Sequence, residues 1–388
     1  MSKRAIQYIT NASSQSGVGH QAVEIARRLK SMADISLTEW QIDGENKKLL
    51  KDGSEITTVR SWPGMLGSKS VNWLRLGQKL KTQNVQGKTD EPLLWHFTNQ
   101  TLSFLAKRLS PSIVTVHDLI ELLEPQDWRA QWLNAYLYGG ITKANHIICV
   151  SEYTKKTVQE HCNVPAEKIT VIHNGVGPEF HPLPQFSNTI AGQELRRELK
   201  LSSDAKVVLY VGSDHPRKGG LTAVRALAAA AAQLDVPLVF LKVGKPGLPA
   251  GRARLLEEIE RLHLAESVRF IDSVSDERLN ELYNLADVFV FPSRLEGFGL
   301  PPLQAMAAGV PVIAAKASSL PEVIAQAGLW HEVDDDATLA QLLVQAITDQ
   351  PLAAKLKSAG LERARNFSWD TAAQKTAEVY RTVADSVG

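Results

Sequence analysis

The stretch that decides the fold spans residues 288–315 and reads VFVFPSRLEGFGLPPLQAMAAGVPVIAA. Its first four residues, Val288 to Phe291, are all apolar, which is typical of a buried strand in a parallel sheet. A glycine-containing loop follows, and the pair Pro301-Pro302 suits the first turn of a helix, where a missing N–H costs little. A Gly-Val-Pro sequence then ends the helix, and residues 310–315 predict the next strand. The expected unit is therefore strand, glycine loop, short helix, strand.

The loop of this unit carries a carboxylate, Glu296, at the carboxyl end of the strand, where open α/β sheets bind ligands. The free N–H groups and the positive end of the following helix favour an anion there. A carboxylate beside an anion site is poor for binding phosphate alone, but it can accept hydrogen bonds from the hydroxyl groups of a sugar. The alternative is that Glu296 only caps the short helix.

The segment EGFGLPPLQAMAAGVPVIA, followed by SSLPEVI, resembles the donor-site signature of family 4 glycosyltransferases. The resemblance implies an α/β fold with two Rossmann-like domains whose parallel sheets face each other across a cleft, the GT-B architecture. It also implies that Glu296 contacts the donor sugar. The donor-binding residues expected beside it are Phe298, Gly299 and Leu300. The family usually has a second Glu, which holds the nucleotide ribose, where this chain has Gln304; glutamine can still hydrogen-bond a ribose hydroxyl but lacks the charge that strengthens the bond.

A second loop with recognisable chemistry follows the strand expected at Lys206–Val211. It starts at Gly212 and contains Arg217 and Lys218 directly before another glycine. Two adjacent cations in a glycine loop suit a diphosphate, because Arg binds two oxygens and Lys supplies a compact charge. The alternative is a solvated charge pair on a turn. The resemblance implies that both cations neutralise the diphosphate leaving group, and that the segment around Ser273 contacts the base through backbone groups.

The N-terminal half begins with a strand expected at Ala5–Ile9 and a loop of small residues before a helical pattern. Gly17 and Gly19 in this loop would let the backbone approach a phosphate closely. A plain strand-to-helix turn is the alternative, because the third glycine and the acidic residue of a dinucleotide-binding motif are not evident. The resemblance implies that the loop faces the donor diphosphate and the acceptor.

His117 and Asp118 directly follow the strand expected at Ile113–Val116, at the ligand edge of the sheet. A hydrogen-bonded loop histidine is the alternative reading of His117. The segment TVHDL resembles the family, which implies that His117 lies close to the transferred sugar. Asp118 is expected to orient that imidazole, face the acceptor hydroxyl or cap the following segment, and the residues do not decide between these roles.

The length of 388 residues exceeds one ordinary core and predicts two domains. An N-terminal Rossmann-like acceptor domain is expected at 1–180, followed by a polar linker at 181–203. A C-terminal Rossmann-like donor domain is expected at 204–365. The resemblance implies that the terminal helix, 366–388, crosses back to the first domain.

Residues 47–90 are irregular and basic, with nine Lys or Arg against three Asp or Glu, and include Trp62 and Trp73. The interpretation we prefer is an acceptor-side lobe whose apolar residues pack inward. The alternative is a peripheral contact with an anionic membrane surface, which basic residues interleaved with tryptophan favour.

The composition excludes several other classes of protein. A net charge of +1 gives no reason to expect nucleic acid as a partner. The two cysteines, Cys149 and Cys162, cannot form a disulfide framework or a zinc cluster, and Cys149 lies in the run HIICV, typical of a buried strand. Without a signal-peptide core or a stretch of about 18 apolar residues, a cytoplasmic protein is expected. No Asp-x-Asp motif lies beside a donor segment, so we expect no metal and no other cofactor.

Together these motifs predict a sugar transferase that uses a nucleoside diphosphate hexose and, as in the resembled family, retains the anomeric configuration. The expected catalytic residues are His117, Arg217, Lys218 and Glu296. The pairing of PRKG with the signature above resembles members that transfer mannose from a guanosine donor, with glucose or a related hexose from a uridine donor next. The acceptor is expected to be a hydroxyl of a glycan or lipid-linked molecule in polysaccharide biosynthesis. The alternatives are a non-catalytic subunit that binds a nucleotide sugar, which Gln304 favours, and a nucleotide-sugar epimerase of the same fold.

Overall fold

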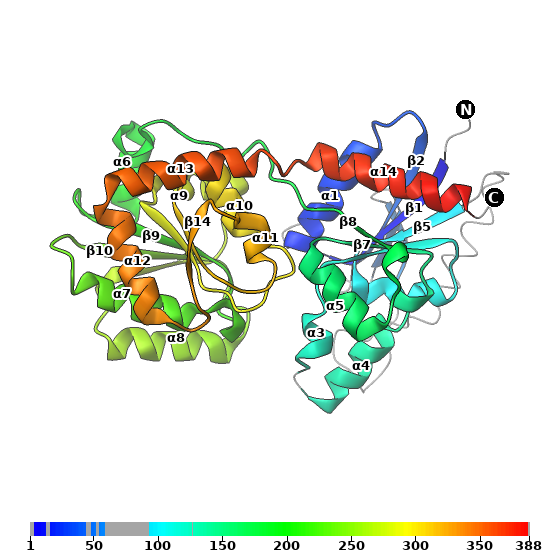
Figure 1. Ribbon diagram of the computed structural model, residues 1–388, viewed down its shortest axis with the longest axis horizontal. Coiled ribbons are helices and arrows are strands. Elements are labelled where there is room, and N and C mark those ends of the chain that lie inside the picture. The colour runs from blue at the N-terminus through cyan, green and yellow to red at the C-terminus, as the bar shows by residue number, and fades with distance from the viewer. Residues whose placement is uncertain are drawn as a thin grey trace. The chain divides into compact units, whose positions relative to one another are not determined.

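The computed structural model describes residues 4–12, 16–43, 48–51, 54–58, 93–125 and 127–386. The chain forms two compact units, one made of residues 1–175 and 369–388 and the other of residues 176–368 (Figure 1). Each unit is an α/β fold built on one sheet, as the sequence predicts. The segment 47–90, with its two alternative readings, lies outside the described residues except for the backbone of two short strands.

The sheet of the first unit has the strand order β4-β3-β2-β1-β5-β6-β7-β8. Neighbours from β2 to β8 are parallel, and β3 and β4 extend the sheet beyond β2 as antiparallel strands. The strands are β1 (Arg4–Thr10), β2 (Ile35–Asp43), β3 (Lys48–Lys51), β4 (Ser54–Thr58), β5 (Leu93–Phe97), β6 (Ser112–Val116), β7 (His146–Cys149) and β8 (Ile169–Val171). Cys149 is fully buried in β7, as predicted, and burial raises the pKa of its thiol. Because the central strands are parallel, the segments after β1 and β6 lie at one edge of the sheet.

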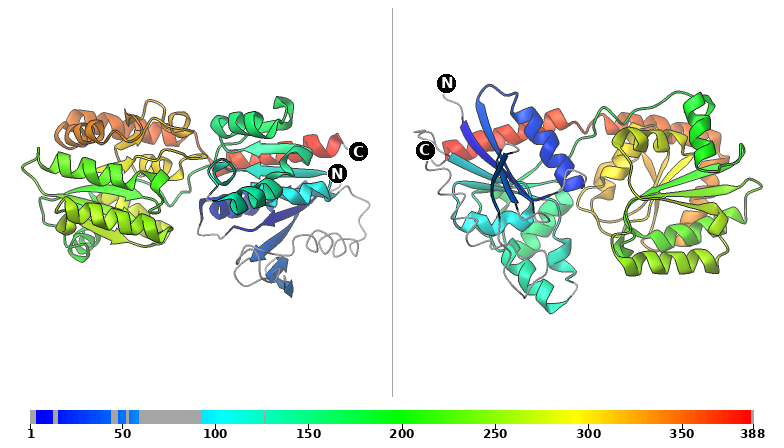
Figure 2. Two further views of the ribbon diagram at one scale, coloured as in Figure 1. Left: turned by 90° about the horizontal axis from the view of Figure 1, so that it is seen from below. Right: turned by 180° about the vertical axis from the view of Figure 1, so that it is seen from behind.

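Helices lie on both sides of this sheet (Figure 2). They are α1 (Gly17–Leu29), η2 (Gln100–Lys107), α3 (Ile120–Leu123), α4 (Trp128–Tyr138), η3 (Ile141–Lys143), α5 (Glu152–Cys162), η4 (Ala166–Lys168) and α14 (Trp369–Asp385), where η marks a 3₁₀ helix. The C-terminal helix α14 belongs to this unit and packs against α1. Its buried Tyr380 hydroxyl lies 2.6 Å from Nδ1 of His96 on β5, which ties the end of the chain to the sheet. No helix in the described part of the chain is both long and apolar enough to cross a bilayer.

The sheet of the second unit is parallel throughout, with the order β11-β10-β9-β12-β13-β14. Its strands are β9 (Lys206–Val211), β10 (Leu238–Val243), β11 (Val268–Ile271), β12 (Val288–Phe291), β13 (Val312–Ala315) and β14 (Gly328–His331). The chain adds strands outward from β9 to β11 and then restarts at β12, on the other side of β9. The boundary between β9 and β12 is therefore the topological switch point, where open α/β sheets bind ligands.

The helices of the second unit cover its sheet on both faces (Figure 2). They are η5 (Phe186–Asn188), α6 (Ile190–Glu198), η6 (Pro216–Lys218), α7 (Gly220–Ala231), α8 (Pro249–Arg261), η7 (Ala265–Ser267), α9 (Asp276–Leu285), α10 (Leu300–Ala307), α11 (Leu320–Ile324), α12 (Asp336–Thr348) and α13 (Gln350–Ala364). The alanine-rich α7 is buried along one side, where it joins the apolar faces of β9 and β10 in the core of the unit.

The prediction of a polar linker between the domains at 181–203 is wrong. These residues belong to the second compact unit and contain η5 and α6. Thr189 caps α6 by accepting a hydrogen bond from the N–H of Gly192, and Leu195 is buried on its inner face. The helix was missed because few apolar residues interrupt its polar sequence, so the periodicity is weak. The compact units divide instead at 175/176 and 368/369.

Candidate functional site

The loop between β12 and α10 has the form that the sequence predicts: strand, glycine loop, short helix, strand. Gly299 precedes α10 with a φ of +106°, and a Cβ there would lie 2.8 Å from the side chain of Leu320. Only glycine adopts such a conformation without strain. The two prolines occupy the first turn of α10, where their missing N–H groups cost no helical hydrogen bond, and the helix begins at the carboxyl edge of the sheet.

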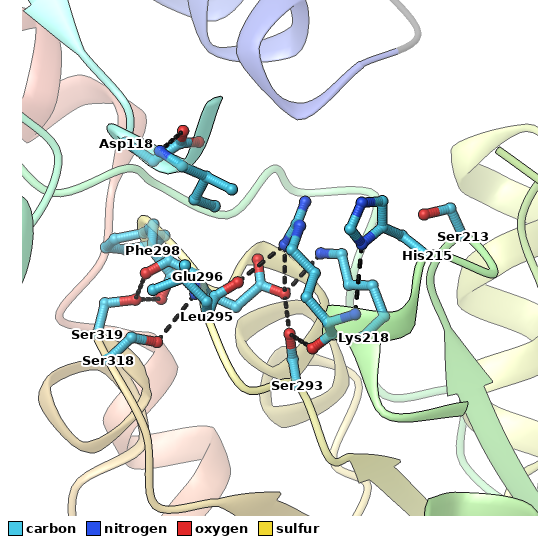
Figure 3. Close-up of polar contacts among 12 residues, drawn as sticks. Asp118, Ser213, His215, Lys218, Ser293, Leu295, Glu296, Phe298, Ser318 and Ser319 are labelled. Carbon is cyan, nitrogen blue, oxygen red and sulfur yellow. Dashed lines mark hydrogen bonds and ion pairs between the residues drawn. The ribbon is translucent and has the colours of Figure 1, made fainter. Parts of the chain in front are cut away.

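Glu296 lies in this loop with 8% of its surface exposed. Its Oε1 accepts hydrogen bonds from Ser293 Oγ at 2.5 Å and from Lys218 Nζ at 2.5 Å, and Nη1 of Arg217 lies 3.6 Å away (Figure 3). The α10 N-terminus has no side-chain cap. The alternative role of Glu296 as a helix cap is therefore wrong, and its carboxylate is directed at the cations of the neighbouring loop.

The charges in this cluster keep Glu296 ionised. Burial alone would raise the pKa of Glu296, but the charges of Lys218 and Arg217, with hydrogen bonds from Lys218 and Ser293, hold it below its ordinary value. Two cations face one carboxylate, so the cluster of Arg217, Lys218 and Glu296 carries one net positive charge. Together with the N-terminus of α10, this charge favours an anionic ligand.

Arg217 and Lys218 lie in η6, directly after β9 and across the switch point from Glu296. The following Gly219 has a φ of +71°, and a Cβ there would lie 2.1 Å from the carbonyl oxygen of Pro292. Arg217 also donates to the carbonyl of Leu295 at 2.8 Å. The two loops therefore pack backbone against backbone, and the solvated charge pair weighed as an alternative is wrong: less than a quarter of either cationic side chain is exposed.

Two serines that the sequence analysis missed hold the Glu296 loop in place. Ser318 accepts a hydrogen bond from the N–H of Glu296 at 2.9 Å. Ser319 donates to the carbonyls of Glu296 and Phe298, at 3.0 and 2.9 Å (Figure 3). Both follow β13 at the same sheet edge, and this position after a strand is the signal that could have identified them.

The other residues expected at the donor site differ in their surroundings. The ring of Phe298 is buried and packs edge-to-face on Phe367. The Oε1 atom of Gln304 accepts a hydrogen bond from the buried Tyr283 hydroxyl at 3.3 Å, so this side chain also has a packing partner. Ser273 is exposed in the loop after β11. Across the described ranges, no group of three or more His, Cys, Asp and Glu side chains is placed to hold a metal ion.

His117 lies in the first unit, at the end of β6, and is 6% exposed. Its Nε2 lies 2.9 Å from the carbonyl of Thr98, which can only accept, so Nε2 carries the proton and Nδ1 the lone pair. Its backbone is held by Gln100, which accepts from its N–H, and by Thr154, which donates to its carbonyl. Burial lowers the pKa of His117 to about 4, so the imidazole is neutral at pH 7.

Asp118 and the two N-terminal glycines have structural roles in the first unit. Asp118 accepts a hydrogen bond from the N–H of Ile120 at 3.0 Å, which supports the turn before α3, although the N-cap position itself is Leu119 and has no side-chain cap. Gly17 and Gly19 lie inside the first turn of α1 rather than in the loop before it. The helix starts early because Ser16 caps it, accepting from the N–H of Gly19 at 3.1 Å.

Two buried histidines predict that the first unit loses stability in mild acid. Burial, with a smaller effect of His117, lowers the pKa of His96 to about 3, and burial lowers that of His117 to about 4. The unfolded chain, with histidine pKa values near 6.5, binds more protons below that pH, so stability falls as the pH falls. We expect the free energy of unfolding to be about 2 kcal/mol lower at pH 5.5 than at pH 7.

Urea denaturation followed by tryptophan emission at both pH values measures this loss. A His96→Gln variant should lose about half of the pH dependence. The matched control is His161→Gln, on the exposed side of α5, which should leave the dependence unchanged. Equal stability of the wild type at both pH values would contradict the burial of the two neutral imidazoles.

Comparison with known proteins identifies two family matches that follow one another along the chain. Residues 16–180 match the family described as Glycosyltransferase Family 4, and residues 192–363 match the one described as Glycosyl transferases group 1. The serotype-specific mannosyltransferase WbdA of Escherichia coli is 28% identical over 282 residues, which are 71% of this chain and 34% of that protein. The O-antigen chain mannosyltransferase B of Escherichia coli is 26% identical over 387 residues, covering 94% of this chain and 96% of that protein.

The fold is also found among solved structures. The structure of Anabaena HepE in complex with UDP and glucose aligns with a TM-score of 0.73 at 20% identity, covering 97% of this chain and 99% of that one. At this identity the likeness shows the GT-B fold alone. The chain spans about a third of the length of the WbdA relatives it matches, 34–36%.

Proposed function

The chain belongs to glycosyltransferase family 4, and from this premise we propose that it transfers a hexose from a nucleoside diphosphate sugar to a hydroxyl group of a glycan or lipid-linked acceptor. The observation that carries the proposal is the buried Glu296 carboxylate, 2.5 Å from Lys218 Nζ, at the switch point of the second sheet. The carboxylate suits the hydroxyl groups of a sugar, and the cations beside it suit a diphosphate.

The proposed chemistry follows from these charges. The bond between the anomeric carbon and the diphosphate breaks, and the acceptor oxygen forms the new bond to that carbon with retention of configuration. Arg217, Lys218 and the N-terminus of α10 stabilise the negative charge that develops on the diphosphate. The departing phosphate takes the proton of the acceptor hydroxyl. Glu296 holds the sugar by accepting from its hydroxyl groups, and the three side-chain contacts of Glu296 described above all fall on Oε1.

We keep His117 as a proposed sugar-facing residue. Because its Nε2–H is donated to Thr98, the neutral imidazole offers Nδ1 as an acceptor for a sugar hydroxyl. A protonated imidazole could not accept a hydrogen bond at Nδ1. The low pKa of His117 thus suits the proposed role at neutral pH.

Mannose from a guanosine donor is the first choice for the transferred sugar, and the names of the two Escherichia coli relatives support it. Glucose or a related hexose from a uridine donor is second, and the UDP and glucose bound to HepE support this choice. We propose polysaccharide biosynthesis as the setting, in the cytoplasm and without a metal ion. For the segment 47–90, the acceptor-side lobe stays the preferred proposal and a peripheral membrane contact the alternative.

Slow hydrolysis of the donor by the purified protein tests the proposal. The panel contains uridine, guanosine and adenosine diphosphate sugars, each in the presence of a chelator. We expect hydrolysis of one donor, and its loss in Glu296→Ala and Arg217→Ala variants. Hydrolysis that survives both substitutions would contradict the proposed site, and hydrolysis that needs an added divalent metal would contradict the metal-independent mechanism.

A second candidate, a subunit that binds a nucleotide sugar without transferring it, is favoured by Gln304. A Gln304→Glu variant separates the two, because glutamate can still accept from the Tyr283 hydroxyl while restoring the charge that the family usually has. A large gain in hydrolysis would support the non-catalytic subunit. A neutral or harmful effect would support an active enzyme whose glutamine suits its own donor.

A further inference from the structure

A buried ion pair lies beneath the loop that carries Arg217 and Lys218. Lys242, on β10, places Nζ 2.6 Å from Oδ1 of Asp214, in the loop after β9, and each side chain is only 1% exposed. Lys242 also donates to the carbonyl of Gly244 at 2.6 Å. Neither residue is used in the chemistry above. A buried lysine and a buried carboxylate are costly unless they pair, so this contact is strongly held.

The pair continues into a wider network of charges. Arg252, on α8, donates its Nε–H to Oδ2 of Asp214. The guanidinium lies 4.2 Å from the ring centre of Phe270, on β11, and its Nη2 is 3.9 Å from the carboxylate of Asp272, whose side chain is mostly exposed. Asp272 directly precedes Ser273 in the loop after β11. The network therefore connects the loops that follow β9, β10 and β11, three neighbouring strands of the sheet.

The backbones of the first two of these loops are in close contact. A Cβ on Gly251 would lie 2.0 Å from the carbonyl oxygen of Asp214, and one on Gly244 would lie 2.6 Å from that of Gly212. The N–H of Asp214 also donates to the carbonyl of Pro246 at 3.0 Å. Neither Gly244 nor Gly251, which lies in the first turn of α8, can be replaced without moving a backbone, so the loop after β9 packs closely enough for Asp214 to reach both Lys242 and Arg252.

The charges themselves add nothing to anion binding, because the two cations are balanced by two carboxylates: Lys242 and Arg252 against Asp214 and Asp272. Stability does not require them either, since a buried ion pair can often be replaced by neutral groups at little cost. What the network does supply is a defined geometry, because the hydrogen bond from Arg252 and the ion pair with Lys242 orient the Asp214 carboxylate in a way that apolar contacts would not.

We propose that Asp214, Lys242 and Arg252 are positioning residues for a nucleoside diphosphate. They hold the loop of Arg217 and Lys218 at a set distance from the loop after β11, so that the diphosphate and the base are bound together. The proposal rests on the proposed function, which places the diphosphate at the first loop and the base at the second. If the loop were displaced, the protein could still bind the diphosphate or the base, but it could not bind both at the same time.

The test compares nucleotide affinity with thermal stability in the full chain. Titration calorimetry measures binding of GDP and of UDP, and thermal unfolding is measured on the same samples. The variants are Lys242→Met, the double variant Asp214→Asn/Lys242→Met, and Arg252→Gln, which keeps the buried pair but breaks its link to Asp272. The matched control is Arg225→Gln, which removes another ion pair of α8, that between Arg225 and Glu258.

We expect the Lys242→Met variant to lose stability and to bind its nucleotide at least about 10-fold more weakly. The double variant should regain stability but not affinity, because no buried charge is left unpaired and the loop is still not held. Arg252→Gln should weaken binding with a smaller loss of stability than Lys242→Met, because Asp214 keeps its ion pair with Lys242, and the control should change neither.

Two results would overturn the inference while leaving the proposed function intact. One is wild-type affinity in a folded Lys242→Met or Arg252→Gln variant. The other is a double variant that regains affinity together with stability, which would show that the network only stabilises the fold. A wild-type protein that binds neither GDP nor UDP would instead overturn the proposed function, and the inference with it.

Discussion

A Glu296→Gln variant is expected to turn over its nucleoside diphosphate sugar about 1,000-fold more slowly than the wild type, while binding the nucleoside diphosphate alone at least as tightly. Glutamine has the same shape but cannot give the charge-assisted hydrogen bonds that we assign to the sugar. Without the carboxylate, Lys218 and Arg217 lose the anion that now lies 2.5 and 3.6 Å from them. Both cations are then more available to the diphosphate, so the two effects should have opposite signs.

Steady-state hydrolysis of the donor and calorimetric titration with GDP or UDP measure the two effects separately. The matched control is Glu194→Gln, which removes an exposed carboxylate on α6 in the same unit. It should change neither quantity. An equal loss of turnover and of nucleotide affinity in Glu296→Gln would indicate that the substitution disrupts the whole loop, and unchanged turnover would exclude Glu296 from the site.

A Lys218→Met variant is expected to lose about 100-fold or more in turnover and to bind the nucleoside diphosphate more weakly. Methionine keeps an apolar stem of similar length and removes the charge of Nζ, which lies 5.5 Å from the centre of the Phe291 ring. The variant therefore distinguishes the effect of the Lys218 charge from the effect of its side-chain packing. Arg217 alone then faces both the diphosphate and Glu296.

The same variant should change the pH profile in a direction that the structure determines. Lys218 is the main opposing charge that lowers the pKa of Glu296 against the effect of burial. Its removal raises that pKa, so the carboxylate is protonated at a higher pH and the acid limb of the turnover profile moves upward. Lys355→Met, an exposed lysine on α13, is the control. An acid limb that stays in place would contradict the Lys218–Glu296 interaction.

Local patterns were sufficient where the physical cause is local. The apolar strand 288–291, the glycines after it and the prolines at the helix start predict the loop that holds Glu296, and the structure confirms each element. The loop after β9 was predicted in the same way, from an apolar run followed by glycines and cations. An apolar strand, a turn at a glycine and a helix that starts at a proline each depend on only a few neighbouring residues. Such elements can therefore be predicted without knowledge of the rest of the fold.

Prediction from the sequence failed where the local signal was weak or was consistent with two structures. In α6 too few apolar residues mark the inner face, and the helix was taken for a linker. In the first turn of α1, the serine cap decided that Gly17 belongs to the helix. Lys242 interrupts an otherwise apolar strand. The sequence of that strand does not predict that the ammonium group is buried against Asp214.

What the sequence by itself determined is therefore the set of elements and the chemistry that each loop carries. Only the tertiary structure decided which loops meet. Lys218 and Glu296 are 78 residues apart and become neighbours because β9 lies beside β12 in the sheet. Ser318 and Ser319 join them from beyond β13, and Lys242 reaches Asp214 from β10. The order of strands follows from the packing of the whole core, in which every apolar face must be covered at once, and no short stretch of residues contains that information.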